Sequence, residues 1–444
     1  MATRARHSAH GAIRPPRRQR LRDFGRAVTY QIGGLPIAVR AGLNRQVATP
    51  DAVIRRAYAR QFWHPHTLSD IGALGVALLI WPFALAGMAA AFVFKNGRIV
   101  AQRSNRSVPR QMLDQFRLYA AAGVLPPWYY IFELHRRPLK SHARDFIYRW
   151  ESKAGVMRLL RESGRQPLSA VNDKAEFFEH CRAHQVATAR VLAVVRDGEI
   201  EQQVHPAELD TDLFVKPVCG RGGKGAERWD RIGAERYRNP QGEELGREEL
   251  FARLQRRSLT TPLLIQTRLR NHPGLAPLNN DALSTVRVLT CLNEAGEPEL
   301  VGAALRMAIG GNHVVDNLHA GGIAAAVDLD SGRLGPASNL GADSSLGWIE
   351  RHPNSDAPVT GVVLPMWDEV RMLAVRAHKA FDDRVLVGWD IAITPDGPMV
   401  VEANGTPDLD IMQRFVRHGL MAARLGVLLA FHLSQLGLDQ IPIA

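Results

Sequence analysis

The chain has 444 residues, of which 46% are apolar and 23% charged, which excludes full disorder, a collagen-like chain and a small disulfide-rich scaffold. Its net charge of +12 is unevenly spread. Residues 1–150 hold 24 Lys and Arg against 6 Asp and Glu, whereas residues 151–444 hold 32 against 38. Three widely spaced cysteines, Cys181, Cys219 and Cys291, show neither a paired framework nor metal-ligand spacing, so we expect free, buried thiols in a reducing compartment.

The N-terminus is rich in arginine: residues 1–60 carry thirteen Arg, no Lys and two Asp. We expect residues 1–70 to form a basic, flexible region, because so few apolar side chains cannot stabilise a fold of their own. A solvated tail, anionic lipid head groups and nucleic acid are the alternatives for this charge. No aromatic side chain interleaves with the arginines before Phe24 and no nucleic-acid module follows, so we expect no nucleic-acid partner.

An uncharged run covers residues 71–94, between Asp70 and Lys95. It is long enough for a membrane span of about 20 apolar residues, although three glycines and Pro82 interrupt it. Basic residues flank both ends, which favours a dip into the cytoplasmic leaflet over a crossing. A helix buried against protein has the same pattern. We expect residues 71–95 to be a membrane-associated or buried helical segment, anionic lipids to be a partner, and residues 96–150 to be a helical connector.

From about residue 151 the pattern changes to short β-branched runs interspersed with helices, which is typical of an α+β enzyme domain. A helix is expected to begin at the capping residue Asp173. Strands are expected at 191–195, 213–216, 263–266, 286–292 and 300–307, and further helices at 247–257, 366–381 and 411–436.

Two β-rich runs joined by Pro395, Asp396 and Gly397 predict a hairpin. A three-residue loop with Gly397 in the left-handed conformation pairs Thr394 with Pro398. The residue numbers of each two paired residues then add up to 792, which places Asp390 opposite Glu402. A two-residue loop would make that sum odd and turn Asp390 to the other face.

The same hairpin carries candidate metal ligands. Glu402 and Asn404 are two residues apart and share a face of their strand. With Asp390 they supply two carboxylates and one amide oxygen, hard ligands that Mg²⁺ accepts beside a phosphate. Solvated acids on the outer face of a hairpin are the alternative.

A second pattern is a strand that delivers Lys216 into a glycine-rich loop, residues 220–225. Successive backbone N–H groups without Cβ atoms can surround phosphate oxygens, and Lys216 adds a point charge. A flexible turn is the alternative, and Ala226 excludes a P-loop. The candidate phosphate-binding residues of this loop are Gly220, Gly222, Gly223, Lys224 and Gly225.

A third pattern runs from Arg306 to Gly322 and holds an arginine, polar residues and a glycine pair that could clamp an anion. Its candidate binding residues are Asn317, His319, Gly321 and Gly322; a hydrogen-bonded loop histidine is the alternative for His319. Arg287 lies in an apolar strand, and Lys174 begins a helix, where a lysine is disfavoured unless an anion lies there.

The order of these elements resembles the ATP-grasp superfamily over residues 150–430. The stretches Asp316 to Gly322, His352-Pro353, Gly361 to Trp367 and Gly388 to Asn404 are similar to the sugar-transfer-associated ATP-grasp branch, which is related to the α-L-glutamate ligases. The resemblance implies an ATP-grasp fold, in which two α+β subdomains hold a nucleotide between them. We expect this domain over 151–436, with a lysine and glycine-loop subdomain at 151–265 and a metal-binding subdomain at 266–436.

By position, the resemblance implies that Lys174 and Lys216 contact the α- and β-phosphates, while the loop 220–225 closes over the triphosphate. Gln266, Thr267 and Leu269 would belong to the hinge that reads adenine, although relatives often have an acidic residue at Thr267. The candidate catalytic cations are Lys216, Arg287 and Arg306, and the expected cofactors are ATP and Mg²⁺, or Mn²⁺ in its place. Asp390, Glu402 and Asn404 would hold the metal.

The resemblance implies an ATP-dependent carboxylate–amine ligase that forms an amide through an acyl phosphate. Its substrates would be a carboxylate and an amine, in a cell-surface polysaccharide or sugar-transfer pathway. A phosphotransferase that stops at the phosphorylated acceptor and a non-catalytic nucleotide-binding membrane adaptor are the alternatives. The expected location is the cytoplasm, at the inner face of the cell membrane.

Overall fold

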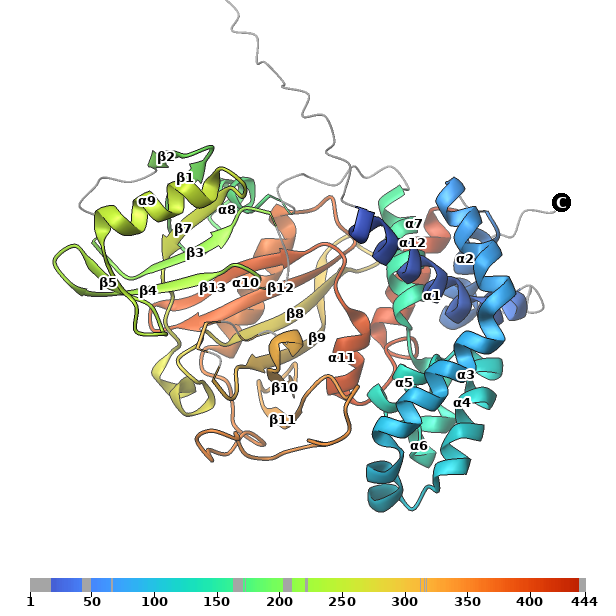
Figure 1. Cartoon of the computed structure of the whole chain (residues 1–444). Helices are drawn as coiled ribbons and strands as arrows, with labels where there is room; N and C mark the ends of the chain where they lie inside the picture. The colour runs from blue at the N-terminus through green and yellow to red at the C-terminus, as the bar shows by residue number, and fades with distance from the viewer. Residues whose placement is uncertain are drawn as a thin grey trace, which may run out of the picture.

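The computed structural model describes residues 17–41, 49–64, 67–162, 171, 173–202, 210–219, 223–311, 313–314, 316 and 318–438. Figure 1 shows a helical part built from the N-terminal residues beside a part that contains two β-sheets. The helical part consists of α1 (Arg17–Ala41), α2 (Pro50–Trp63), α3 (Leu68–Ser104), α4 (Val108–Ala122), α5 (Pro126–Ile131), α6 (Arg137–Ser141), η1 (Ala143–Asp145), η2 (Trp150–Val156) and α7 (Met157–Glu162).

The region predicted to be a flexible N-terminal tail instead contains two packed helices, α1 and α2. Both helices bury apolar side chains, and Ile32, Ile54 and Tyr58 are almost fully buried. Gly33 allows a close approach, since a Cβ atom there would lie 2.7 Å from the ring of Trp150. The prediction was wrong because these few apolar side chains pack both on one another and on later parts of the chain, which together supply the burial that the segment alone lacks.

The first sheet is antiparallel and has the strand order β2-β1-β7-β3-β4-β5-β6. Two helices, α8 and α9, belong to the same part of the chain and lie beside it in Figure 1. The bounds are α8 (Lys174–Ala183), β1 (Val191–Arg196), β2 (Glu199–Gln202), β3 (Leu213–Pro217), β4 (Glu227–Gly233), β5 (Arg236–Arg238), β6 (Glu244–Gly246), α9 (Arg247–Ser258) and β7 (Leu263–Thr267). The predicted boundary between residues 265 and 266 therefore cuts through β7, which pairs with β1 and β3 along both edges.

The second sheet is also antiparallel and has the order β11-β10-β9-β8-β12-β13. Its elements are η5 (Pro273–Leu278), β8 (Thr285–Leu292), β9 (Pro298–Met307), η6 (Leu318–Ala320), β10 (Ile323–Val327), β11 (Leu334–Ser338), α10 (Trp367–Ala380), β12 (Leu386–Thr394) and β13 (Gly397–Asn404), followed by α11 (Leu409–Val416) and α12 (Arg424–Gln435). The two antiparallel sheets with flanking helices agree with the expected α+β fold class.

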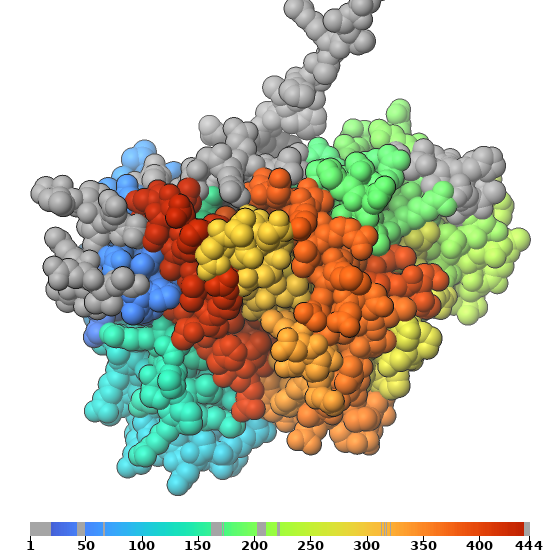
Figure 2. Space-filling view, turned by 180° about the vertical axis from the view of Figure 1, so that it is seen from behind, coloured from blue at the N-terminus to red at the C-terminus, as the bar shows by residue number. Residues whose placement is uncertain are grey.

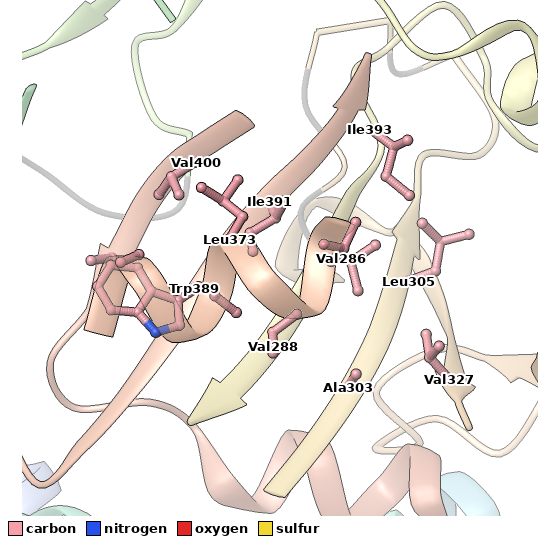
Figure 3. Packing of buried hydrophobic residues seen from close by; sticks show 14 of the residues in the cluster. Val286, Val288, Ala303, Leu305, Val327, Leu373, Trp389, Ile391, Ile393 and Val400 are labelled. Atoms are coloured by element: carbon pink, nitrogen blue, oxygen red, sulfur yellow. The ribbon is translucent and has the colours of Figure 1, made fainter. Parts of the chain in front are cut away.

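One face of the second sheet forms the main apolar core. Trp389 and Ile391 of β12 point to the same side as Val400 of β13 and meet Leu373 of α10, as Figure 3 shows. Phe178 and Leu264 from the first part of the domain belong to the same cluster. The opposite face of the sheet, which carries the even-numbered residues of β12, is thereby left for polar side chains.

The hairpin β12–β13 has a two-residue loop, because Thr394 pairs with Gly397 and not with Pro398 as predicted. From this turn to the pair of Ile391 and Val400, the residue numbers of each two partners add up to 791. A β-bulge at Val401 then adds one residue to β13, so that Asp390 lies opposite Glu402 after all.

The bulge solves a conflict between core packing and the polar face. Val400 and Ala403 of β13 both belong to the apolar core, although they are three residues apart. Strict alternation would place Glu402 on the core face with Val400. The extra residue moves Glu402 to the face of Asp390 and returns Ala403 to the core, which a pattern of alternating residues does not reveal.

The C-terminal region differs from its prediction. The single helix expected over 411–436 is broken into α11 and α12, because Arg417 adopts the left-handed conformation with φ of +59°. The intervening segment reaches η1, where the amide of Met421 donates to the Asp145 carbonyl at 2.8 Å. Among the cysteines, Cys181 and Cys291 are buried as expected, whereas Cys219 is exposed two residues beyond the end of β3.

Helix α12 packs against α2, so the two ends of the described chain share one apolar cluster that includes Ile54, Leu425 and Leu428. Figure 2 shows the same arrangement from behind, with the red C-terminal segment against the blue and cyan helices. The N-terminal helices are therefore part of the support of the second sheet and not an appendage.

We predict that Ile54→Ala lowers the unfolding free energy of the full chain by about 2–4 kcal/mol, because Ile54 is fully buried and a cavity would remain. Chemical denaturation followed by fluorescence measures this. Leu68→Ala is the matched control, since Leu68 is 88% exposed and its loss should change stability by about 0.5 kcal/mol or less. Equal stability of the Ile54→Ala and wild-type proteins would contradict the packing described for α2.

Candidate active site

Lys216 lies near the end of β3 and is buried against the ring of Phe178, with its Nζ atom 4.7 Å from the ring centroid. Burial lowers the pKa of Lys216 to about 7; the Glu402 carboxylate raises this pKa and the Lys174 ammonium lowers it further. Lys216 belongs to the first sheet and Glu402 to the second. Because the charge of Glu402 affects the pKa of Lys216, the two sheets lie close together at this site.

Lys174 lies in the first turn of α8, as predicted. The Asp173 side chain caps this helix by accepting hydrogen bonds from the amides of Ala175 and Glu176 at 2.8 and 3.2 Å. The Lys174 amide also donates to the carbonyl of Val218 at 3.3 Å. The start of the helix is therefore fixed beside the end of β3, which explains why Lys174 acts on Lys216.

The glycine-rich loop follows Cys219. Gly220 and Gly222 lie outside the described residues, whereas Gly223, Lys224 and Gly225 form an exposed turn. Gly225 has φ of +74°, and a Cβ atom there would approach the guanidinium of Arg257 to 2.7 Å. Arg257 donates to the Gly225 carbonyl and ion-pairs with Glu227, so the C-terminal side of the loop is held by α9.

Asp390 is the centre of a buried group of charges on β8, β9 and β12. Arg287 lies directly across the ladder and donates to both carboxylate oxygens, with Nη2 3.0 Å from Oδ2. Arg306 from β9 places its Nη2 3.0 Å from the same Oδ2. Burial alone would raise the pKa of Asp390, but the two arginines outweigh it and hold that pKa below its usual value.

Arg306 is held by a second acid that the sequence patterns did not single out. Asp316 accepts hydrogen bonds from the backbone amide and hydroxyl of Thr285 at 2.8 and 2.6 Å, and lies 3.3 Å from Arg306. Burial raises the pKa of Asp316, whereas Asp316, Asp390 and Glu402 together raise that of Arg306. In the sequence, Asp316 could have been identified as a candidate from its position directly before Asn317, within the polar segment that runs from Arg306 to Gly322.

Glu402 pairs with Asp390 across the hairpin, and Asn404 lies two residues further along β13 on the same face. Within the described part of the chain, Glu402 forms no ion pair within 4 Å, and Asn404 Nδ2 is buried without a hydrogen-bond partner. Both side chains are thus uncommitted, and their oxygens fit a hard divalent cation. Asp390 fits less directly, since Arg287 and Arg306 already occupy its oxygens, and one lone pair remains for a metal.

The predicted hinge residues are only partly available to a ligand. Gln266 is buried in β7, paired with Val191 on one side and Phe214 on the other. The amide of Thr267 donates to the Arg190 carbonyl at 3.0 Å. The strand ends here, and Leu269 follows as a half-buried residue, so backbone groups beyond Thr267 are the better candidates for contact with a base.

The segment before β10 is described only in part. Asn317 lies outside the described residues. His319 is exposed on η6, and Gly321 has φ of +94°, which favours glycine at that turn. Gly322 is buried directly before β10, the strand in which Ala324 pairs with Arg306.

A further ionic cluster joins the helical part to the segment after Asn404. Arg149 lies 2.9 Å from Asp410 and 3.5 Å from Asp408, and Lys153 also ion-pairs with Asp408. Burial would raise the pKa of Asp408, but Arg149 and Lys153 lower it below its usual value. These contacts, which span more than 250 residues, were beyond the reach of local sequence patterns.

A family model described as Sugar-transfer associated ATP-grasp matches residues 161–425 of this chain. None of the curated proteins matches it. D-cycloserine synthetase is 16% identical over 60% of this chain and 70% of its own, with a TM-score of 0.34. The ATP-grasp ligase PsnB, solved with a minimal precursor, Mg and ADP, is 16% identical over 61% of this chain and 60% of its own, with a TM-score of 0.31.

The D-alanine–D-alanine ligase from Coxiella burnetii is 11% identical over 61% of this chain and 59% of its own, with a TM-score of 0.35. This chain therefore spans between 59% and 70% of these three solved proteins.

We predict that Lys216→Met raises the melting temperature of the ligand-free protein at pH 7 by about 2 °C or more, the shift that roughly 1 kcal/mol produces in a domain of this size. The pKa of the Lys216 ammonium is near 10.5 in the unfolded chain and about 7 in the folded protein. The unfolded chain therefore binds a proton at this amine up to a higher pH than the folded protein does. The penalty that Lys216 imposes is full below pH 7 and disappears as the pH rises to 10.5, and so does the gain of the variant.

Differential scanning calorimetry at several pH values measures this gain. Lys224→Met is the matched control, because Lys224 is exposed and its replacement should leave the pH dependence of stability unchanged. A destabilised Lys216→Met protein at pH 7 would contradict the burial of an uncompensated amine at this position.

Proposed function

Because this chain belongs to the sugar-transfer associated ATP-grasp family, we propose that it is an ATP-dependent ligase that joins a carboxylate to an amine through an acyl phosphate. The observation that carries the proposal is the pairing of Asp390 with Glu402, close to Lys216 and beside two partly buried arginines. This arrangement provides both cations for a triphosphate and carboxylates for a divalent metal. The family's description supports an acceptor from a sugar-transfer pathway.

Lys216 is suited to detect a polyanion. With a pKa of about 7 in the ligand-free protein, its amine is only partly protonated at neutral pH. Phosphate oxygens beside it would raise that pKa and make the ammonium the favoured form. Lys174, fixed at the start of α8, adds a second positive charge from the same side.

Arg287 and Arg306 are suited to the transferring phosphoryl group. Their guanidinium groups are positioned before any ligand arrives, since Asp390 and Asp316 hold them by ion pairs. Preorganised donors of this kind stabilise charge that develops in a transition state without reorganisation at the moment of reaction. The acids that position them also keep Arg306 charged.

A divalent metal would be held by Glu402 and Asn404, with Asp390 as a third ligand through its remaining lone pair. When bound, such an ion neutralises charge on the phosphate oxygens. Among the described residues, no group of three or more His, Cys, Asp or Glu side chains is arranged to hold a metal ion by itself, so phosphate and water oxygens would complete the coordination.

The chemistry needs no nucleophile from the protein. The acceptor carboxylate attacks the γ-phosphorus of ATP, the bond to the bridging oxygen breaks, and ADP leaves with the electron pair. An amine then attacks the acyl carbon, loses a proton and expels phosphate. Burial raises the pKa of Cys181 to about 12 and that of Cys291 further, which removes both thiols as nucleophiles. The chain's own residues bind, orient and exclude water.

We predict that Glu402→Gln lowers ATP turnover by roughly 10²-fold or more while the protein stays folded, because Glu402 is half-buried and forms no ion pair within the described residues. A screen of ADP release against panels of carboxylates and amines measures turnover. Asp396→Asn, at the exposed tip of the same hairpin, removes an equal charge and should retain full activity.

The products of this screen separate the possible activities. Free phosphate released in step with an amide supports the ligase, whereas a stable phosphorylated acceptor assigns a phosphotransferase. If the protein binds ATP but hydrolyses or transfers none of it, whichever acceptor is added, it is a non-catalytic nucleotide-binding adaptor. Wild-type turnover by a folded Glu402→Gln protein would overturn the metal assignment.

A further inference from the structure

The outer face of α3 is apolar over most of its length. This helix is long and apolar enough to cross a membrane, with a mean hydropathy of 2.2 in its most apolar 18-residue window, yet only 22% of that window is buried. Leu79, Phe83 and Phe94 are 77%, 80% and 93% exposed. A core helix of a soluble domain passes the same length and composition criteria but buries such side chains.

The inward face of the same helix carries mostly small side chains, with Ala73, Ala77 and Ala89 almost fully buried. Larger side chains, Leu85 and Val100 among them, are buried on the same face as these alanines, whereas the outer face exposes leucine and phenylalanine side chains along most of the helix. An amphipathic helix of a soluble protein pairs such an apolar inward face with a polar outer face, and the outer face of α3 is not polar. This difference indicates that an apolar medium or partner covers the outer face.

Helix α4 extends this face. It lies against α3, where Gln111 donates to the Gly97 carbonyl at 2.8 Å, and it exposes Leu113 and Phe116 on its outer side. In Figure 1, α3 and α4 lie at the edge of the molecule farthest from the first sheet. We call the exposed apolar side chains of the two helices the α3–α4 face; they are Leu68, Ile71, Val76, Leu78, Leu79, Ile80, Phe83, Phe94, Leu113 and Phe116.

The charges around the α3–α4 face are positive. Arg98, Arg110 and Arg117 are exposed, and within the described part of the chain they form no ion pair within 4 Å. The two acids of these helices are neutralised, since Asp70 pairs with Arg158 and Asp114 with Arg106 and Lys140. A second copy of this chain would bring arginine against arginine, whereas anionic lipid head groups are complementary to this pattern.

The contacts of α3 exclude a perpendicular crossing in this fold. Its beginning pairs with α7 through Asp70 and Arg158 at 3.7 Å. Its middle stacks Trp81 on Tyr119 with 5.7 Å between the ring centroids.

Its end is held by the loop before Trp348. Asn96 accepts a hydrogen bond from the Ser344 amide at 2.8 Å, and Arg103 donates to the Ser344 and Ser345 carbonyls at 2.6 and 2.7 Å. A crossing would separate the two ends of α3 by a hydrocarbon core about 30 Å thick, although both are attached to one folded body.

We propose that the α3–α4 face docks laterally on an anionic lipid bilayer, with both helices lying in the plane of the membrane surface. The apolar side chains enter the boundary between head groups and acyl chains, and Arg98, Arg110 and Arg117 contact lipid phosphates. The uncharged segment 71–94 is about 36 Å long as a helix, so it supplies an extended line of contact rather than a point anchor. This docking is independent of the proposed activity.

Vesicle co-sedimentation of the full chain tests the docking. Wild-type protein should bind vesicles of phosphatidylcholine mixed with phosphatidylglycerol, and Leu79→Gln/Phe83→Gln should weaken that binding by about tenfold or more, since two large apolar side chains no longer enter the membrane. Leu259→Gln is the matched control, because Leu259 is 64% exposed on the first sheet's side of the molecule and its replacement should leave binding unchanged. The melting temperatures of both variants should equal that of the wild type.

A second variant tests the charges. Arg98→Gln/Arg110→Gln/Arg117→Gln should abolish the preference for anionic over phosphatidylcholine vesicles at low salt. Undiminished vesicle binding by Leu79→Gln/Phe83→Gln would overturn the proposal, and so would a change of oligomeric state in that variant without a change in vesicle binding, which assigns the face to a second copy. Resistance of the wild-type protein to extraction from membranes by alkaline carbonate would assign a crossing instead and overturn lateral docking.

Discussion

The candidate site depends on one network of ion pairs on the second sheet. Asp390 lies between Arg287 and Arg306, and Asp316 holds Arg306 from the other side. Removal of either partner from a buried ion pair leaves an uncompensated charge, which is far more costly than the loss of the pair itself. The three adjacent strands β8, β9 and β12 must therefore keep their register, and that register delivers two oriented cations and one carboxylate to the same face of the sheet.

The helical part and the ATP-grasp part form one body. Arg149 and Lys153 ion-pair with Asp408, directly after the strand that carries Glu402 and Asn404, and Arg149 also holds Asp410. Helix α2 meanwhile supports α12 through a shared apolar cluster. Whatever fixes the orientation of the helical part consequently fixes the orientation of the candidate site, so a protein docked through the α3–α4 face presents its site at a constant height above the lipid surface.

The sequence allowed much of the sheet structure to be predicted, because β-branched runs such as 286–292 carry a local signal. It also identified Lys216, Arg306 and Glu402 as candidates from residue type and order. What failed depended on long-range contacts: α1 packs on α3, α2 packs on α12, and Asp316 owes its place to Thr285 and Arg306. Local composition contains no information on such partners, and the exposure of Cys219 was missed for the same reason.

The bulge at Val401 has a consequence for the length of this hairpin. Without residue 401 the pairs on both sides of it would join in one regular ladder, with Val400 still opposite Ile391 and Glu402 still opposite Asp390. A deletion at this position leaves every side chain on its face, whereas a deletion at Met399 would turn Val400 out of the core and Val401 into it while Glu402 stays opposite Asp390. Relatives can therefore differ by one residue between the aspartate and the glutamate and still place both acids together. A search that demands a fixed spacing between the two would overlook them.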